Sequence, residues 1–282
     1  MKVIRGKRAM ITGAASGIGR AIALELARHG AHTYLVDVDE TGLDAVADEV
    51  RALGVEALVR KCDVADPIKN SAAVNYLLDQ WGTLDLLVNN AGITYYGRTL
   101  QMSAEHWERL LAINLHAPIQ FTRELMPALL KRGDAHVLNV ASICGLVGLA
   151  RVTAYTTSKF ALVGFSESLR HECARMGLGV TALCPGLVDT NLFTSAPLGR
   201  DLRQAKTPPR WTLITPEAVA RRAVRAIRRN EGLVVMQPTA RLLYYVKRLT
   251  PGLLDLAHRL RRRRQDPPTP PQTPAEGLRR AA

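Results

Sequence analysis

The sequence has few cysteines and no long apolar run. Its four cysteines (Cys62, Cys144, Cys173 and Cys184) lie far apart, with no CxxC pair and no histidine at metal-ligand spacing. The seven histidines form no metal constellation either, so we expect free thiols and no metal site. No stretch reaches the roughly 18–20 apolar residues of a membrane span. The first residues lack the apolar core of a signal peptide, so we expect a cytoplasmic protein.

The net charge of +13 comes from one part of the chain. Residues 1–199 hold 19 Lys and Arg against 19 Asp and Glu, whereas residues 200–282 hold 19 against 6. Hydrophobic residues make up 47% and charged residues 22%, which is ordinary for a globular protein and excludes wholesale disorder. A chain of 282 residues suits one α/β domain with an appendage, or at most two small domains.

Short apolar runs alternate with longer helical ones along most of the chain. Strands are predicted at 8–12, 32–37, 55–62, 84–88, 135–140, 180–184 and 233–236. Helices are predicted at 17–29, from the end of the second strand through residue 52, and at 68–81, 103–131, 153–176 and 216–229. Ser103 is the expected N-cap of the helix at 103–131. Continuous apolar strands are typical of a sheet covered by helices on both faces. The alternation therefore predicts an α/β fold with a doubly wound parallel sheet, of Rossmann type, in one domain at 1–237.

A glycine-rich segment, TGAASGIG at 12–19, joins the first predicted strand to the first predicted helix. Its glycines let the backbone approach a pyrophosphate, which the N–H groups of the helix would bind. Asp37 ends the second predicted strand, where a carboxylate can accept bonds from both ribose hydroxyls and repel a 2′-phosphate. Neither Ser16 nor Val38 offers a cation, so we predict NAD rather than NADP. The alternative is that Asp37 only caps a helix.

Tyr155 and Lys159 lie four residues apart in a predicted helix, so their side chains share a face. A phenol has a pKa of about 10 and is a poor base at neutral pH. A nearby ammonium and an oxidised nicotinamide would both favour the phenolate, which can exchange a proton with an alcohol. Ser142 follows a predicted strand and can hold the substrate oxygen. The alternative is that the segment merely begins an amphipathic helix.

Over about residues 5–236 the sequence resembles the short-chain dehydrogenase/reductase family. The resemblance rests on motifs in the family's order: TGAASGIG at 12–19, Asp63-Val64, NNAG at 89–92, Asn114, Ser142, YTTSK at 155–159 and Pro185-Gly186. It implies that Asn114, Ser142, Tyr155 and Lys159 are catalytic. Lys159 would also bind the nicotinamide ribose, and Asn114 would hold a water that links Lys159 to solvent. Ala117 stands where the family often has Gly.

The resemblance also implies a set of cofactor contacts. They are Gly13, Ser16, Gly17, Ile18, Gly19, Asp37, Asp63, Val64, Asn90, Ala91, Gly92, Tyr155, Lys159, Pro185, Gly186, Val188 and Thr190. Asp63 and Val64 would meet the adenine, and the last four would flank the nicotinamide. Asn90 can instead mainly brace the central strands. We also expect a homodimer or homotetramer.

The segment 189–213 is where the family carries its substrate lid. Apolar candidates for the substrate pocket are Leu192, Phe193, Leu198 and Trp211 in this segment, Ile143, Leu146, Val147 and Leu149 near Ser142, and Tyr95 and Tyr96. If several face the cleft rather than the core, the substrate is an apolar secondary alcohol or ketone. The alternatives are an NADPH-dependent carbonyl reductase and a non-catalytic dinucleotide-binding scaffold.

Residues 238–264 are predicted to form a basic amphipathic helical extension, interrupted at Pro251-Gly252, and the proline-rich residues 265–282 a disordered tail. Through 240–264 such an extension can make peripheral contact with an anionic membrane. It can also cover the substrate cleft or a neighbouring subunit, or be solvated. The basic run lacks interleaved stacking aromatics and a recognition fold, so we expect no nucleic-acid partner.

Overall fold

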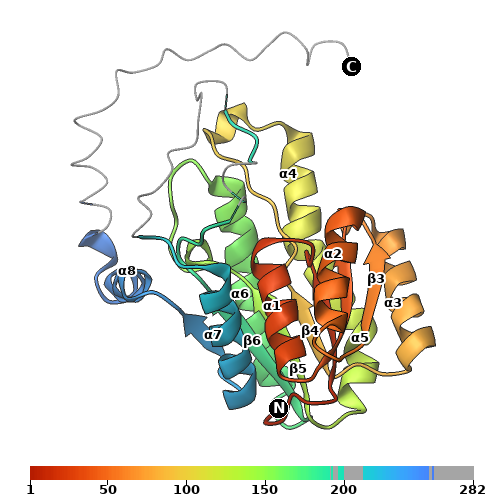
Figure 1. Ribbon diagram of the computed structural model, residues 1–282. Helices are drawn as coiled ribbons and strands as arrows, with labels where there is room; N and C mark the ends of the chain where they lie inside the picture. Colours follow the sequence, from red (N-terminus) through yellow and green to blue (C-terminus); the bar gives the residue numbers. More distant parts are fainter. Residues whose placement is uncertain (191, 193–195, 200–211, 254–255, 257–282) are drawn as a thin grey trace. The chain divides into compact units, whose positions relative to one another are not determined.

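The computed structural model describes residues 1–190, 192, 196–199, 212–253 and 256. Contacts divide the chain into two units, Met1–Arg241 and Leu242–Ala282. The first unit is built around a seven-stranded parallel sheet with helices on both faces (Figure 1). This confirms the predicted Rossmann-type, doubly wound fold. The expected domain boundary at residue 237 stays a prediction.

The strands of the sheet run in the order β3-β2-β1-β4-β5-β6-β7. They are β1 (Arg8–Thr12), β2 (His32–Asp37), β3 (Ala57–Lys61), β4 (Leu86–Asn89), β5 (Ala135–Val140), β6 (Leu178–Cys184) and β7 (Leu233–Val235). The winding direction changes at β1, which pairs with both β2 and β4. In a doubly wound sheet, this change opens a crevice at the carboxyl ends of the central strands, where ligands bind.

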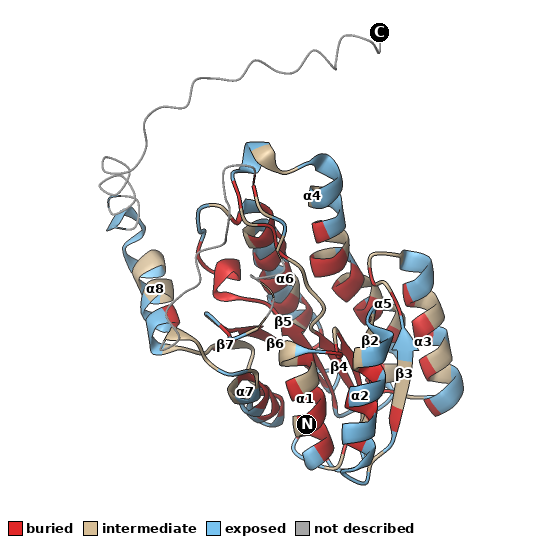
Figure 2. Cartoon of the chain, turned by 45° about the horizontal axis from the view of Figure 1, so that its top comes forward, coloured by how far each residue is buried: buried red, intermediate tan, exposed pale blue. Residues whose placement is uncertain are grey.

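Two apolar cores form because successive strand side chains alternate between the faces. The helices are α1 (Gly17–Arg28), α2 (Glu40–Arg51), α3 (Pro67–Trp81), α4 (Ala104–Leu111), α5 (Ala117–Leu130), α6 (Thr153–Glu172), α7 (Pro216–Arg229) and α8 (Pro238–Leu249). Residues of α1, α2 and α7 share one core with Ile11. Residues of α3, α5 and α6 share the other with Met10. Figure 2 shows the sheet buried between these layers.

Most predicted bounds agree with the observed ones to within a few residues, but the predicted helix at 103–131 does not form as one α-helix. A π-helical segment, Ala112–His116, separates α4 from α5, and the Ala117 N–H donates to the Ala112 carbonyl. Pro118 explains the break, because it has no N–H for the Asn114 carbonyl and its ring would clash there in an α-helix. Ser103 caps α4 as predicted, by accepting from the His106 N–H.

The predicted extension at 238–264 begins as helix α8, and residues 251–253 are again helical after Thr250. Most of residues 254–264 and all of the predicted tail at 265–282 lie outside the described residues. Among the residues that are described, no helix has both the length and the apolar character that crossing a bilayer requires.

Candidate active site

A cleft of about 1140 Å³ opens where the strands of the sheet end. Of the residues predicted for the site, those that line this cleft are Gly13, Ser16, Gly17, Ile18, Asp37, Asp63, Val64, Asn90, Ala91, Gly92, Ser142, Tyr155, Lys159, Pro185, Gly186, Val188 and Thr190. The structure thus brings together residues from seven places in the sequence. Gly19 and Asn114 lie behind the lining, and both support it.

The glycine loop follows β1 and leaves no room for a side chain at Gly13 or Gly19. A Cβ at Gly13, where φ is +66°, would lie 2.8 Å from the Ala91 Cα, and one at Gly19 would overlap the Gly13 carbonyl oxygen. Asn90 braces the loop, since its Nδ2 donates to the carbonyls of Thr12 and Gly13 at 3.0 Å each. Asn90 therefore both lines the cleft and joins β4 to the loop, so the bracing role that the sequence left open is present.

Asp37 ends β2 beside this loop. Its Oδ2 accepts from the Ala15 N–H at 3.0 Å, and its Oδ1 accepts from the N–H groups of Val38 and Asp39 at 2.7 and 3.1 Å. The helix-cap alternative for Asp37 is wrong, because Asp39 caps α2 by accepting from the Gly42 N–H. Arg20, which was not predicted, also lines the cleft, but its guanidinium is paired with Glu49 at 2.6 Å.

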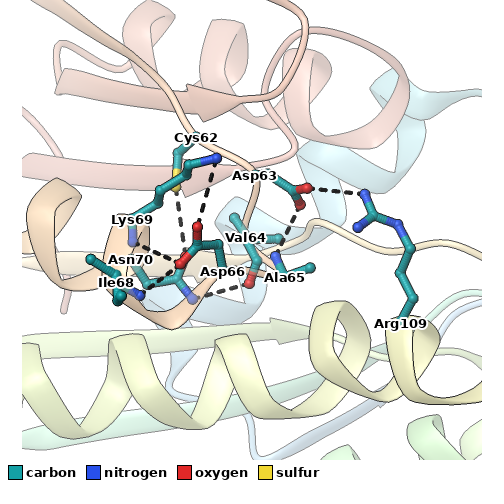
Figure 3. A network of polar contacts seen from close by, with 9 residues as sticks. All are labelled: Cys62, Asp63, Val64, Ala65, Asp66, Ile68, Lys69, Asn70 and Arg109. Atoms are coloured by element: carbon teal, nitrogen blue, oxygen red, sulfur yellow. Dashed lines mark hydrogen bonds and ion pairs between the residues drawn. The ribbon is translucent and has the colours of Figure 1, made fainter. Parts of the chain in front are cut away.

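The Asp63-Val64 segment after β3 is held by a polar network (Figure 3). Asp63 accepts from the Ala65 N–H and from Arg109 Nη2, each at 3.1 Å, and Asn70 donates to the Val64 carbonyl at 3.0 Å. Burial alone would raise the pKa of Asp63, but these two donors hold it below its usual value. Arg109 comes from α4 and was missed, because no local pattern links residues 46 apart.

The Ser142, Tyr155 and Lys159 side chains meet at the floor of the cleft. Tyr155 and Lys159 project from α6, and Ser142 follows β5. Lys159 Nζ donates to the Val140 carbonyl at 2.9 Å and lies 5.6 Å from the centroid of the Tyr155 ring. Ser142 Oγ accepts from the Cys144 N–H at 3.1 Å, which leaves its own proton to donate. The shared helix face inferred from the sequence spacing is therefore observed.

Burial is the largest influence on the pKa values of Tyr155 and Lys159 in the protein without cofactor. It raises the pKa of Tyr155 well above its usual value, although a hydrogen bond with Ser142 opposes this. Burial also lowers the pKa of Lys159 to about 8. The expected acidification of Tyr155 by Lys159 is thus not seen here, because the phenolate would lose its water and Lys159 alone does not compensate.

Asn114 is fully buried in the π-helical segment behind the cleft. Its Oδ1 accepts from the Ile93 N–H at 2.9 Å, and its Nδ2 donates to the Ile93 carbonyl and to Ser158 Oγ at 2.9 and 3.1 Å. A Cβ at Gly92 would lie 3.3 Å from Asn114 Oδ1 and 3.6 Å from Lys159 Nζ. The missing side chain at Gly92 therefore leaves a space that both polar groups face.

The apolar candidates divide between the cleft and the core. Those that line the cleft are Ile143, Leu149, Tyr96 and Leu192. Leu146, Val147 and Tyr95 are buried, and Leu198 pairs through its backbone with Tyr96. Phe193 and Trp211, with most of the predicted lid, lie outside the described residues. Sequence reasoning missed the lining residues Thr94, His106, Cys144 and Val152.

The segment after β6 is fixed by Gln237, which sequence reasoning also missed. Its Oε1 accepts from the Gly186 N–H, and its Nε2 donates to the Leu187 carbonyl at 2.9 Å. Val188 then forms a bridge with Ile214. Together with the glycine loop and the Asp37 carboxylate, this edge of the cleft fits a dinucleotide, because the α1 N-terminus has no side-chain cap and its N–H groups can bind phosphate.

Known proteins resemble the chain across this fold and cleft. A model of the family described as short chain dehydrogenase matches residues 7–200. The "Probable oxidoreductase EphD" of Mycobacterium tuberculosis is 35% identical over 262 residues, covering 89% of this chain and 44% of that protein. The chain thus spans less than half the length of that relative.

Two solved structures are also similar. A short chain dehydrogenase/reductase from Burkholderia phymatum in complex with NAD has a TM-score of 0.76 and 28% identity, covering 96% of this chain and 100% of that one. L-Sorbose reductase from Gluconobacter frateurii, complexed with NADPH and L-sorbose, has a TM-score of 0.75 and 28% identity, covering 84% and 97%. With a family model that matches most of its length, the chain belongs to the short-chain dehydrogenase/reductase family of oxidoreductases.

Proposed function

We propose that the chain is an NAD-dependent dehydrogenase that interconverts apolar secondary alcohols and ketones, with Tyr155 as the acid and base. The observation that carries this proposal is that Ser142, Tyr155 and Lys159 line the same cleft as Asp37 and the glycine loop. A dinucleotide held along that cleft would reach from the carboxylate to the tyrosine. The residues predicted as cofactor contacts would hold it there.

Three side chains manage the proton at the reaction end. Ser142 Oγ donates to the substrate oxygen and orients it, and the Tyr155 hydroxyl exchanges a proton with that oxygen. Lys159, whose pKa burial lowers to about 8, would in its ammonium form favour the phenolate of Tyr155. When bound, the dinucleotide supplies the hydride chemistry and, in its oxidised form, a positive charge that favours this phenolate further.

The space beside Gly92 provides a place for the water that would connect Lys159 to solvent. An added methyl group would lie 3.3 Å from Asn114 Oδ1 and 3.6 Å from Lys159 Nζ, and would exclude that water. We expect Gly92→Ala to lower kcat about ten-fold, and NAD affinity is measured separately because Gly92 is also a predicted cofactor contact. Steady-state kinetics and calorimetry check this. Gly164→Ala on α6 meets nothing within 4 Å and serves as the control. If kcat of Gly92→Ala were unchanged, a water beside Gly92 would not be needed for proton transfer.

NAD preference is attributed to the Asp37 carboxylate, which would repel a 2′-phosphate. We expect Asp37→Asn to shift the ratio of kcat/KM for NAD over NADP at least about ten-fold towards NADP. The Asn Oδ1 can still accept from the Val38 and Asp39 N–H groups, while the hydrogen bond from the Ala15 N–H is lost. Asp39→Asn makes the same charge change two residues away and should leave the ratio near that of the natural protein. If both variants shift the ratio equally, Asp37 is not the selector.

An NADPH-dependent carbonyl reductase with the same catalytic residues is the second candidate, favoured by the likeness to the NADPH-bound sorbose reductase. The apolar lining, including Ile143, Leu149, Val152 and Leu192, supports an apolar substrate in either case. A panel of secondary alcohols and ketones, assayed with each dinucleotide by nicotinamide absorbance, separates the two candidates. Faster turnover with NADPH, or turnover of polar substrates alone, would overturn the proposal.

We further propose that the protein forms a homodimer or homotetramer, which light scattering would measure.

A further inference from the structure

Helix α8 carries a row of exposed apolar side chains. Leu242, Tyr245 and Leu249 are 66%, 56% and 76% exposed, and their spacing of three and four residues places them on one helix face. Leu253 and Leu256 continue the spacing and are also exposed. We call these five residues the leucine stripe. Figure 2 shows much of α8 in the colours of exposed and intermediate residues, whereas helices α1 and α5 turn their apolar faces to a core.

Positive charge borders the leucine stripe. Arg241 and Arg248 are exposed and lie four residues before and three after Tyr245, so they flank the stripe on one side. Residues 240–264 hold eight Lys and Arg, against one acidic residue, Asp255. Residues 1–199 are electrically balanced, and residues 240–264 supply +7 of the net charge of +13, which attracts anionic surfaces to this part of the chain.

We propose that the leucine stripe docks on an anionic phospholipid bilayer. The apolar side chains would enter the boundary between headgroups and acyl chains, and the flanking arginines would meet lipid phosphates. Tyr245 suits this level of a bilayer, because its ring is apolar and its hydroxyl is polar. The proposal does not depend on the proposed catalytic function.

The charge pattern favours lipid over other occupants of this face. If two copies paired through the stripe, the three cations of α8 in one copy (Arg241, Lys247 and Arg248) would come close to those of the other, and α8 has no acidic residue to offset them. A purely electrostatic partner such as a nucleic acid would leave the leucines in water. An anionic bilayer satisfies the apolar and the cationic side chains together.

Co-sedimentation of the full chain with vesicles tests the proposal. We expect binding to vesicles of phosphatidylcholine mixed with phosphatidylglycerol, and at least about ten-fold weaker binding to phosphatidylcholine alone. Added salt should weaken the binding, because the screening length falls from about 10 Å at 0.1 M to about 3 Å at 1 M. Absent binding, or equal binding to both vesicles, would overturn the proposal.

A matched pair of variants assigns the binding to the stripe. Leu242→Ser/Leu249→Ser/Leu253→Ser should bind the anionic vesicles at least about ten-fold more weakly, since the bilayer would bury three fewer leucine side chains. The control, Val3→Ser/Leu53→Ser/Ile68→Ser, removes three exposed apolar side chains elsewhere and should bind like the natural protein. Circular dichroism spectra like that of the natural protein show that both variants fold. Undiminished binding by the stripe variant would refute the proposal. So would a smaller oligomer of that variant in light scattering, because the stripe would then pack against a second copy.

Discussion

Tyr155→Phe is expected to lower kcat about 1000-fold, within the range that general acid–base catalysis supplies. The variant removes one hydroxyl group and keeps the ring, which is buried in the cleft floor beside Lys159 and Ser142. NAD affinity should stay close to that of the natural protein, because Asp37 and the glycine loop are untouched. Steady-state kinetics and calorimetric titration with NAD measure the two effects separately.

Tyr34→Phe is the matched control for this variant. Tyr34 is also fully buried, but its hydroxyl donates to the Ala73 carbonyl at 3.1 Å in the core, outside the cleft. That variant should lose some stability and keep its kcat. If Tyr155→Phe retained activity within about ten-fold of the natural protein, Tyr155 could not be the acid and base.

Acid should destabilise the fold through His136 in the middle of the sheet. This side chain is fully buried on β5, with Nε2 2.8 Å from Thr181 Oγ1, and burial lowers its pKa to about 3. The unfolded chain takes up the proton near pH 6.5, so between these values it binds more protons than the folded chain. Stability is therefore lost as the pH falls through this window. From pH 6.5 to about 4.5 the loss from His136 is about 2 kcal/mol.

Urea unfolding at a series of pH values measures this dependence. His136→Gln, which cannot take up a proton, should be less stable near neutral pH but should lose about 2 kcal/mol less on acidification than the natural protein. His171→Gln changes an exposed histidine at the end of α6 and should leave the pH dependence unchanged. An identical acid dependence in all three proteins would show that other groups cause it.

The fold could be predicted from the sequence because its signals are local and repeated. Strands buried on both faces give continuous apolar runs, and the chain connects them through helices, which leaves a parallel sheet as the consistent arrangement. The bounds of β1, β2, β5 and α7 agree with the prediction. The π-helical segment was missed although Pro118 indicates it, because proline is often tolerated early in a helix. Pro118, however, comes after α4 and the π-helical segment, so it interrupts a helix that has already begun.

The site was predictable where a motif sits at the end of an element. The glycine loop after β1, Asp37 at the end of β2 and Ser142 after β5 reach the cleft because parallel strands end at one edge. Arg109 and His106 reach it, and Gln237 holds the segment beside it, through tertiary packing, which leaves no trace in local spacing. The pKa of Tyr155 was also beyond the sequence, because it depends on how much water the folded cleft removes.

The π-helical segment also resolves a conflict between two neighbours. Ahead of it, α4 turns His106 and Arg109 to the cleft, and beyond it α5 turns Phe121 and Leu125 to the sheet. One additional residue in a turn changes the phase of all later side chains by about 100°. The segment therefore rotates the side chains of α5 relative to those of α4. As a result, two helices that are joined only by this segment can direct side chains to the cleft at one end and to the sheet at the other. A chain one residue shorter here would have to give up one of the two alignments.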